Sequence, residues 1–133
     1  MRHLLKKKHS DIQVLSAGTN AMAGFGPTLE TIEVMRRQGI DVSKHVAQPV
    51  TEHLIHHADL ILCMEEIHRD DLLSRLPEAK GKVHLLRRFA KDSPEGNPNI
   101  NIPDPIGRPG EVYETCFLMI REAVERVVKE VTG

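Results

Sequence analysis

The sequence has no long apolar run, no excess of charge of either sign and only two cysteines among its 133 residues. Apolar runs such as residues 60–64 fall far short of the roughly 20 residues that a membrane-spanning helix needs, and residues 1–8 lack the apolar core of a signal peptide. We therefore expect a cytoplasmic chain with no membrane partner. Because 18 basic residues are balanced by 19 acidic ones, no net field favours nucleic acid as a partner.

The chain offers little for binding a metal. Cys63 and Cys116 lie in apolar surroundings, without metal-ligand spacing and without the density of a disulfide scaffold, so we expect reduced thiols. His53, His56 and His57 fall about one helical turn apart, but no cysteine or third fixed ligand accompanies them. A solvated helix face explains these histidines better than a metal site, and we expect no metal or cofactor.

Strand-like and helix-like segments alternate along the chain. Residues 12–16, 60–63 and 83–86 are short apolar runs of strand length, and the segments between them have helical periodicity. Such alternation is typical of parallel strands joined by crossover helices. We expect one α/β domain over residues 1–133.

Helices are predicted over about residues 27–39, 51–57, 65–76 and 110–131. Pro27 and Thr51 suit a first turn and an N-cap, whereas Gly39 and Pro77 suit helix ends. The last helix carries the clearest buried stripe, formed by Val112, Cys116, Met119, Ile120, Ala123, Val124, Val127, Val128 and Val131.

The first residues raise a question about where the fold begins. Residues 2–9 resemble the closing turns of a helix, because basic residues are favourable near a helix C-terminus; a solvated basic tail is the alternative. A doubly wound sheet normally opens with a strand that leads into its first helix. If residues 2–9 end a helix, a strand and its following loop are missing ahead of them.

The long loop over residues 91–110 is the first candidate for chemistry, because loops of this length in small domains are often functional. Pro103 and Pro105 fix the backbone on both sides of Asp104, and Gly107 permits the turn that follows. A carboxyl group held in this way is suited to protonating a leaving group. From local sequence alone, an ordinary turn is the competing interpretation.

A nucleophile to work with Asp104 is harder to find. Cys63 and Arg69 match the C-x-x-x-x-x-R spacing of cysteine phosphatases, but Glu65 and Glu66 lie between them and would repel a phosphate dianion. The intervening residues also include no glycine to let backbone amides converge. We therefore interpret Cys63 as a core residue. Cys116 lies in the apolar stripe of the last helix and is interpreted in the same way.

Five segments in order carry a family resemblance: residues 14–19, residues 39–41 with His45, residues 58–64, residues 81–83 and residues 103–105. Together they resemble the low-molecular-weight protein-tyrosine-phosphatase family. The resemblance implies a three-layer α/β/α fold with a parallel sheet. It also implies hydrolysis of phosphorylated protein side chains through a cysteinyl phosphate, with Asp104 as the general acid.

The resemblance assigns further site residues. Ser16 and His45 match positions that brace the phosphate-binding loop, and Ala21 and Met22 match the wall of the substrate cleft. Ile106 stands where tyrosine-directed members carry an aromatic residue. Because protein-arginine phosphatases belong to the same family and arsenate reductases resemble it, the resemblance leaves the substrate class open.

The main departure from the family is at its opening strand and C-x-x-x-x-x-R-S loop, which this sequence lacks. We expect a truncated phosphatase domain that is inactive as it stands; the rival hypothesis is a non-catalytic binding module. The first strand of the family lies inside the sheet, so its absence leaves the neighbouring strands with unpaired backbone groups. We therefore predict that the remaining strands pair directly, or that copies of the chain associate as a homo-oligomer.

Overall fold

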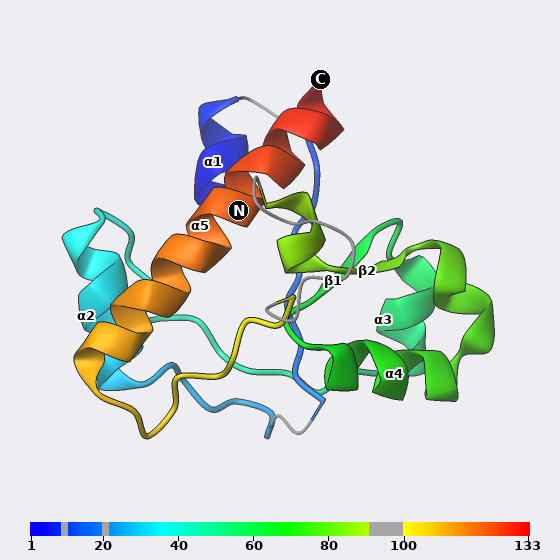
Figure 1. The fold of residues 1–133 in the computed structure, drawn as a ribbon, viewed down its shortest axis with the longest axis horizontal. Coiled ribbons are helices and arrows are strands. Elements are labelled where there is room, and N and C mark those ends of the chain that lie inside the picture. The colour runs from blue at the N-terminus through cyan, green and yellow to red at the C-terminus, as the bar shows by residue number, and fades with distance from the viewer. Residues whose placement is uncertain (9–10, 20–21, 91–99) are drawn as a thin grey trace.

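The computed structural model describes residues 1–8, 11–19, 22–90 and 100–133. In chain order the elements are α1 (Arg2–Lys7), α2 (Leu29–Arg37), α3 (Glu52–His57), β1 (Ile61–Cys63), α4 (Glu66–Arg75), the 3-10 helix η1 (Pro77–Gly81), β2 (Val83–Leu85), the 3-10 helix η2 (Leu86–Phe89) and α5 (Gly110–Thr132). Figure 1 shows α1, α2 and α5 on one side of the two strands, and α3 and α4 on the other. In the described residues, no helix is long and apolar enough to cross a membrane.

The two strands form a parallel sheet. Ile61 pairs with Val83, Leu62 with His84 and Cys63 with Leu85. The chain between them forms α4 and η1, which is the helical crossover that a parallel pair requires. The predictions of a strand over residues 60–63 and of another over residues 83–86 are confirmed, each shorter by one residue.

The prediction of a strand over residues 12–16 is wrong. This segment is irregular, and the nearest strand-like contact is a single parallel bridge between Gly18 and Pro49. Val14 still packs against the core, whereas Leu15 is 62% exposed. An apolar pattern gives strand propensity only, and a ladder also needs a neighbouring strand to take its backbone hydrogen bonds. We expected the remaining strands to pair directly with one another. Among the described residues, this segment pairs with neither β1 nor β2, so that expectation is wrong for it.

The helix ends follow the predicted capping chemistry closely. Thr51 accepts the Leu54 backbone N–H at its hydroxyl over 3.2 Å and begins α3 as expected. Thr28 caps α2, since its hydroxyl accepts the Thr31 N–H at 3.3 Å. Pro27 therefore lies before the helix, and the prediction that it occupies the first turn is wrong. Gly39 follows α2 with a φ of 75°, a left-handed conformation that favours glycine.

The core divides into two clusters of buried side chains, one on each side of the strands. Leu5, Leu86, Ile102, Ala123, Val124, Val127 and Val128 form the first; Ile55, Cys63, Leu72, Leu76, Ala79, Val83 and Leu85 form the second. Leu5 places α1 in the first cluster, so residues 2–7 form a packed helix and not a solvated tail. Val131 is 39% exposed, so the predicted stripe on α5 ends one turn before the helix does.

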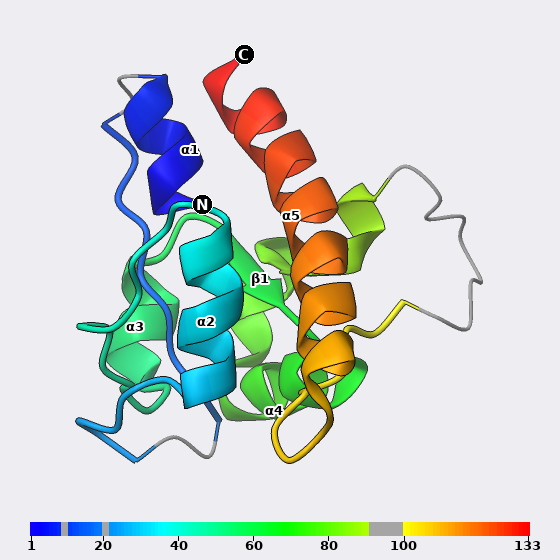
Figure 2. The ribbon, with the colours of Figure 1, turned by 90° about the vertical axis from the view of Figure 1, so that its left-hand side faces the viewer.

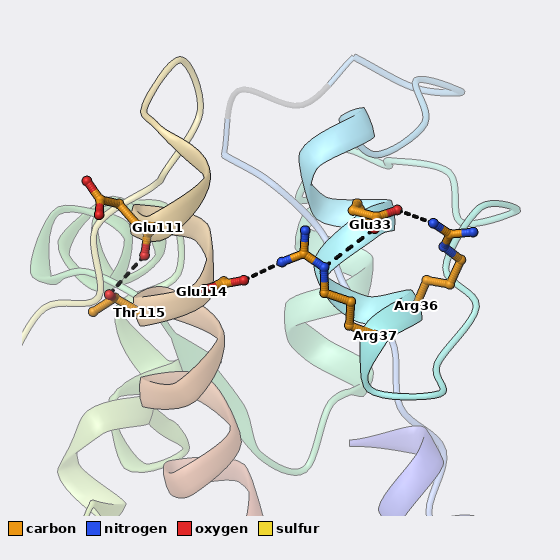
Figure 3. Close-up of polar contacts among 6 residues, drawn as sticks. All are labelled: Glu33, Arg36, Arg37, Glu111, Glu114 and Thr115. Atoms are coloured by element: carbon orange, nitrogen blue, oxygen red, sulfur yellow. Dashed lines mark hydrogen bonds and ion pairs between the residues drawn. The ribbon is translucent and has the colours of Figure 1, made fainter.

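Polar contacts hold α2 against the first half of α5. Figure 3 shows Arg37 of α2 between two carboxylates, Glu33 on its own helix and Glu114 on α5. The Thr28 hydroxyl also lies 3.5 Å from the hydroxyl of Tyr113 on α5. Exposed ion pairs contribute only about 0–1 kcal/mol each, so their main effect is on how the two helices align.

Candidate functional site

Asp104 lies on the loop that leads into α5, and local hydrogen bonds hold it there. Its Oδ1 accepts the Ile106 backbone N–H at 3.0 Å, which closes an Asx turn. The Arg108 N–H donates to the Pro105 carbonyl at 2.9 Å, and Gly107 takes a φ of 76°. The side chain is exposed, and its second oxygen, Oδ2, has no partner among the described residues. That oxygen can accept a hydrogen bond from water or from a bound molecule.

Ile102 anchors the start of this loop in the protein interior. Its side chain is only 2% exposed and belongs to the same core cluster as α5. Its backbone N–H donates to the carbonyl of Met64, just after β1, at 2.8 Å. The acid loop is therefore fixed to both the sheet and the last helix.

We expect Ile102→Ala to lower the free energy of unfolding by about 2–5 kcal/mol, because it removes a fully buried aliphatic side chain. Urea denaturation monitored by circular dichroism measures the change. Ile67→Ala is the matched control, since Ile67 is 70% exposed and its truncation should cost less than about 0.5 kcal/mol. Equal losses for the two variants would contradict the anchoring role.

Cys116 of α5 contacts the acid loop through its thiol. Its thiol donates to the Pro103 carbonyl with an Sγ–O distance of 3.4 Å, and the residue is buried. Burial is the larger cause that raises the pKa of the Cys116 thiol, and the negative charge of Asp104 is the smaller one. A thiol that is buried and protonated is a poor nucleophile, so Cys116 acts as a packing residue.

Cys63 has the spacing of a phosphatase nucleophile but not its environment. It is 5% exposed, and burial raises the pKa of its thiol to about 11, against a smaller opposing effect of Arg69. Arg69 itself lies between Glu66, at 3.6 Å, and Asp70, at 3.2 Å. The guanidinium is thus paired with carboxylates.

The backbone after Cys63 is also occupied. Asn101 accepts the Glu66 N–H at its Oδ1 over 2.6 Å and donates from Nδ2 to the Glu66 carboxylate over 3.1 Å. This side chain caps the first turn of α4, where a phosphate would have to bind. The structure therefore offers no phosphate cradle between Cys63 and Arg69.

We expect both thiols of the native chain to react slowly with iodoacetamide at pH 7. A pKa of about 11 for Cys63 leaves about 100-fold less thiolate than an ordinary thiol with a pKa near 9. Alkylation followed by mass spectrometry measures the rate, and the urea-unfolded chain is the control that should react at the ordinary rate. Rapid alkylation of Cys63 in the folded chain would contradict this assignment.

Ser16 and His45, which lie 29 residues apart in the sequence, are brought together. The Ser16 Oγ and the His45 Nε2 are 3.3 Å apart, and Gln48 donates from Nε2 to the Ser16 carbonyl at 2.9 Å. Beside them is a hollow of about 320 Å³, lined by Arg2, Ser16, Lys44, His45, Val46 and Gln48. The lining holds two permanent cations and no carboxylate, which suits an anionic or polar occupant.

Met22 and Ile106, predicted to line the substrate cleft, are both on the surface, at 66% and 65% exposure. Ala21 lies outside the described residues. Figures 1 and 2 place the loop before α2 and the loop before α5 at the same end of the molecule. Among the described residues, no hydrogen bond joins Asp104 to Ser16 or His45.

Phe25 is a surface residue that the sequence reasoning did not single out. It is 63% exposed, and its carbonyl accepts the Ala47 N–H at 2.7 Å, which ties the Met22 loop to the His45 loop. An aromatic residue between Gly24 and Gly26, in a loop of mostly small residues, is the signal that could have identified it.

The histidines of α3 contact one another and the helix backbone. The rings of His53 and His57 are 4.1 Å apart, and the His57 Nδ1 lies 2.9 Å from the His53 carbonyl oxygen. Across residues 1–8, 11–19, 22–90 and 100–133, no group of three or more His, Cys, Asp or Glu side chains is placed to hold a metal ion.

A parallel pair of strands with helices on both sides defines the chain as an α/β protein. A low-molecular-weight protein tyrosine phosphatase from T. tengcongensis has this fold, with a TM-score of 0.84 and 30% identity over 96% of this chain and 84% of that one. The sequence pattern of the family described as "Low molecular weight phosphotyrosine protein phosphatase" matches residues 1–133. The chain belongs to this family of hydrolases.

Two curated relatives show the range of the family. A probable low molecular weight protein-tyrosine-phosphatase, EpsP, from Ralstonia nicotianae is 31% identical over 96% of this chain and 83% of its own length. A protein-arginine-phosphatase from Geobacillus stearothermophilus is 30% identical over 96% of this chain and 82% of its own length. The relatives therefore include phosphatases named for two different phosphorylated side chains.

Proposed function

We propose that this protein takes part in hydrolysing phosphorylated protein side chains, with Asp104 as the general acid. The observation that carries this proposal is the anchored carboxylate: one oxygen closes the Asx turn and the other has no partner among the described residues. In the first step a cysteine thiolate bonds to phosphorus, the bond from phosphorus to the leaving atom breaks, and Asp104 gives its proton to that atom, which is oxygen in a phosphotyrosine and nitrogen in a phosphoarginine. In the second step the Asp104 carboxylate takes a proton from the attacking water, the water oxygen bonds to phosphorus, and the sulfur–phosphorus bond breaks to return the thiolate and release phosphate.

We infer that the nucleophile does not come from these 133 residues. The spacing C-x-x-x-x-x-R occurs at Cys63, but Asp70 follows the arginine, and both cysteines are buried with raised pKa values. The chain by itself is therefore inactive. We define a fused form, in which the opening strand and C-x-x-x-x-x-R-S loop of an active family member precede Met1. A phosphatase assay on this fused form, with and without Asp104→Asn, tests the proposal.

Ser16 and His45 are the proposed brace for that loop. Their side chains lie 3.3 Å apart at the edge of the 320 Å³ hollow, whose Arg2 and Lys44 could face the loop's polar backbone. Arg2 is already oriented, because its Nε donates to the Val14 carbonyl at 2.8 Å. The rival function is a non-catalytic module that binds a partner through this hollow. The same lining residues support it, and it needs no nucleophile. An in-frame C-x-x-x-x-x-R-S segment upstream of Met1 in the gene would favour the phosphatase.

The proposed cleft wall bears on the choice of substrate. Met22 and Ile106 are aliphatic and exposed, so they offer no stacking partner for a phosphotyrosine ring. Both phosphotyrosine and phosphoarginine therefore stand as candidate substrates, in line with the names of the relatives. A single domain, a cytoplasmic location and a homo-oligomer remain predictions.

We expect Ile106→Tyr in the fused form to raise kcat/KM for a phosphotyrosine peptide by about 2- to 12-fold, the value of one aromatic pair. Steady-state phosphate release measures this change. A phosphoserine peptide is the control, because its side chain has no planar group to stack on a tyrosine and should gain nothing. An equal gain on both peptides would show that Ile106 does not face the substrate side chain.

A further inference from the structure

A second cavity lies on a different part of the molecule from the acid loop. It has a volume of about 660 Å³ and is lined by His84, Arg88, Phe89, Arg126, Lys129 and Glu130. These residues come from β2, from η2 and from the last turns of α5. With a rise of about 1.5 Å per residue, Arg126 lies about 24 Å along α5 from Gly110, where the acid loop joins the helix. Figure 1 shows η2 beside the C-terminal half of α5.

Two of the cations in this cavity have no carboxylate partner in the part of the chain that the structure describes. Among the described residues, the one polar side-chain contact of Arg88 joins its Nη1 to the Nδ1 of His84 at 3.1 Å, which orients the guanidinium without neutralising it. Lys129 forms no ion pair within the described ranges, and Arg126 pairs with Glu122 at 2.7 Å. Glu130 is the one carboxylate in the lining, against three permanent cations. The cavity therefore favours an anion.

Helix electrostatics explain only part of this arrangement. Lys129 is in the last turn of α5, where a cation stabilises the helix dipole, so it can be explained as a solvated surface residue. Arg126 lies before that turn and pairs with Glu122. Arg88 belongs to η2 and gains nothing from that dipole, yet it lines the same cavity. Cations from two separate elements thus line one open surface pocket.

We propose that this cavity binds a small molecule that carries two or more phosphate groups. Two guanidinium groups offer forked N–H donors that match phosphate oxygens. The volume is within the range of small-molecule pockets, roughly 300–1,000 Å³. The Phe89 ring, which meets His84 edge to face with centroids 6.4 Å apart, supplies an apolar wall for a flat ring. A nucleoside polyphosphate uses all of these features, whereas an inorganic polyphosphate uses only the cations.

Isothermal titration calorimetry on the 133-residue chain tests the site with two probes, ATP and inorganic tripolyphosphate. We expect both to bind, ATP more tightly. Arg88→Gln and Lys129→Gln should each weaken binding of either probe by about 10- to 100-fold, the effect of one charge-assisted contact. Phe89→Leu should weaken ATP only. Circular dichroism confirms that each variant is folded.

Arg121→Gln is the matched control. Arg121 is also on α5, has almost the same side-chain exposure as Arg126, 48% against 46%, and also faces a glutamate one turn away. It does not line the cavity, so its loss should leave both affinities unchanged. No binding of either probe, or equal weakening by Arg121→Gln and Arg88→Gln, would overturn the proposal. Equal affinity for the two probes, lost in Arg88→Gln but not in Phe89→Leu, would assign the site to inorganic polyphosphate.

Discussion

We expect the 133-residue chain, assayed alone on para-nitrophenyl phosphate, to release no more p-nitrophenolate than buffer does. The reason is the state of its two thiols. Cys63 is buried with a pKa of about 11, so only about one molecule in ten thousand carries the thiolate at pH 7. The adjacent helix start is capped by Asn101, and Arg69 is paired with carboxylates, so a phosphate would find neither amides nor a free guanidinium there.

The fused form provides the positive control for this prediction. Adding the opening strand and its cysteine loop should raise turnover by several orders of magnitude, since loss of a catalytic nucleophile costs on the order of 10⁶-fold in kcat in a well-studied hydrolase. Cys63→Ser should change neither the inactive chain nor the active fused form. Turnover by the chain alone that disappears in Cys63→Ser would mean that Cys63 is the nucleophile after all.

The sequence predicts most of the helices because their signals are local. Thr51 caps α3 as expected, Gly39 follows α2 in a left-handed conformation, and the apolar stripe on α5 packs as predicted over most of its length. Strands depend on distant partners, and that is where the prediction fails. Residues 12–16 have the composition of a strand, but no strand in the described part of the chain lies beside them to complete a ladder.

The candidate site divides in the same way. The Asx turn at Asp104 depends on neighbours in the sequence, Pro103, Pro105 and Gly107, and could be predicted from them. The contact between Ser16 and His45 spans 29 residues and was expected only from the family resemblance. The role of Asn101, which caps α4 from 35 residues away, had no sequence signal at all. Electrostatic reasoning still excluded Cys63, because Glu65 and Glu66 are visible in the sequence.

Asp104→Asn in the fused form should lower kcat for phenyl phosphate by about 10²- to 10⁴-fold, the usual contribution of a positioned general acid. The amide keeps the hydrogen bond from the Ile106 N–H to the side-chain oxygen, so the loop should hold its shape, but it cannot give up a proton. Comparing two leaving groups distinguishes the loss of proton donation from a disturbed loop structure. The loss should be much smaller for para-nitrophenyl phosphate, because p-nitrophenolate is a weaker base and leaves with less need of protonation.

Asp41→Asn is the matched control for this variant, because Asp41 makes the same kind of turn. Its Oδ1 accepts the Ser43 backbone N–H at 2.9 Å, two residues ahead, as Asp104 does with Ile106. If loss of an Asx-turn carboxylate merely loosened a loop, both variants would lose activity to a similar degree, and equally on both esters. If Asp104 is the proton donor, only Asp104→Asn loses activity, and the loss grows with the basicity of the leaving group. A loss that does not vary with the leaving group would mean that Asp104 is only a turn residue.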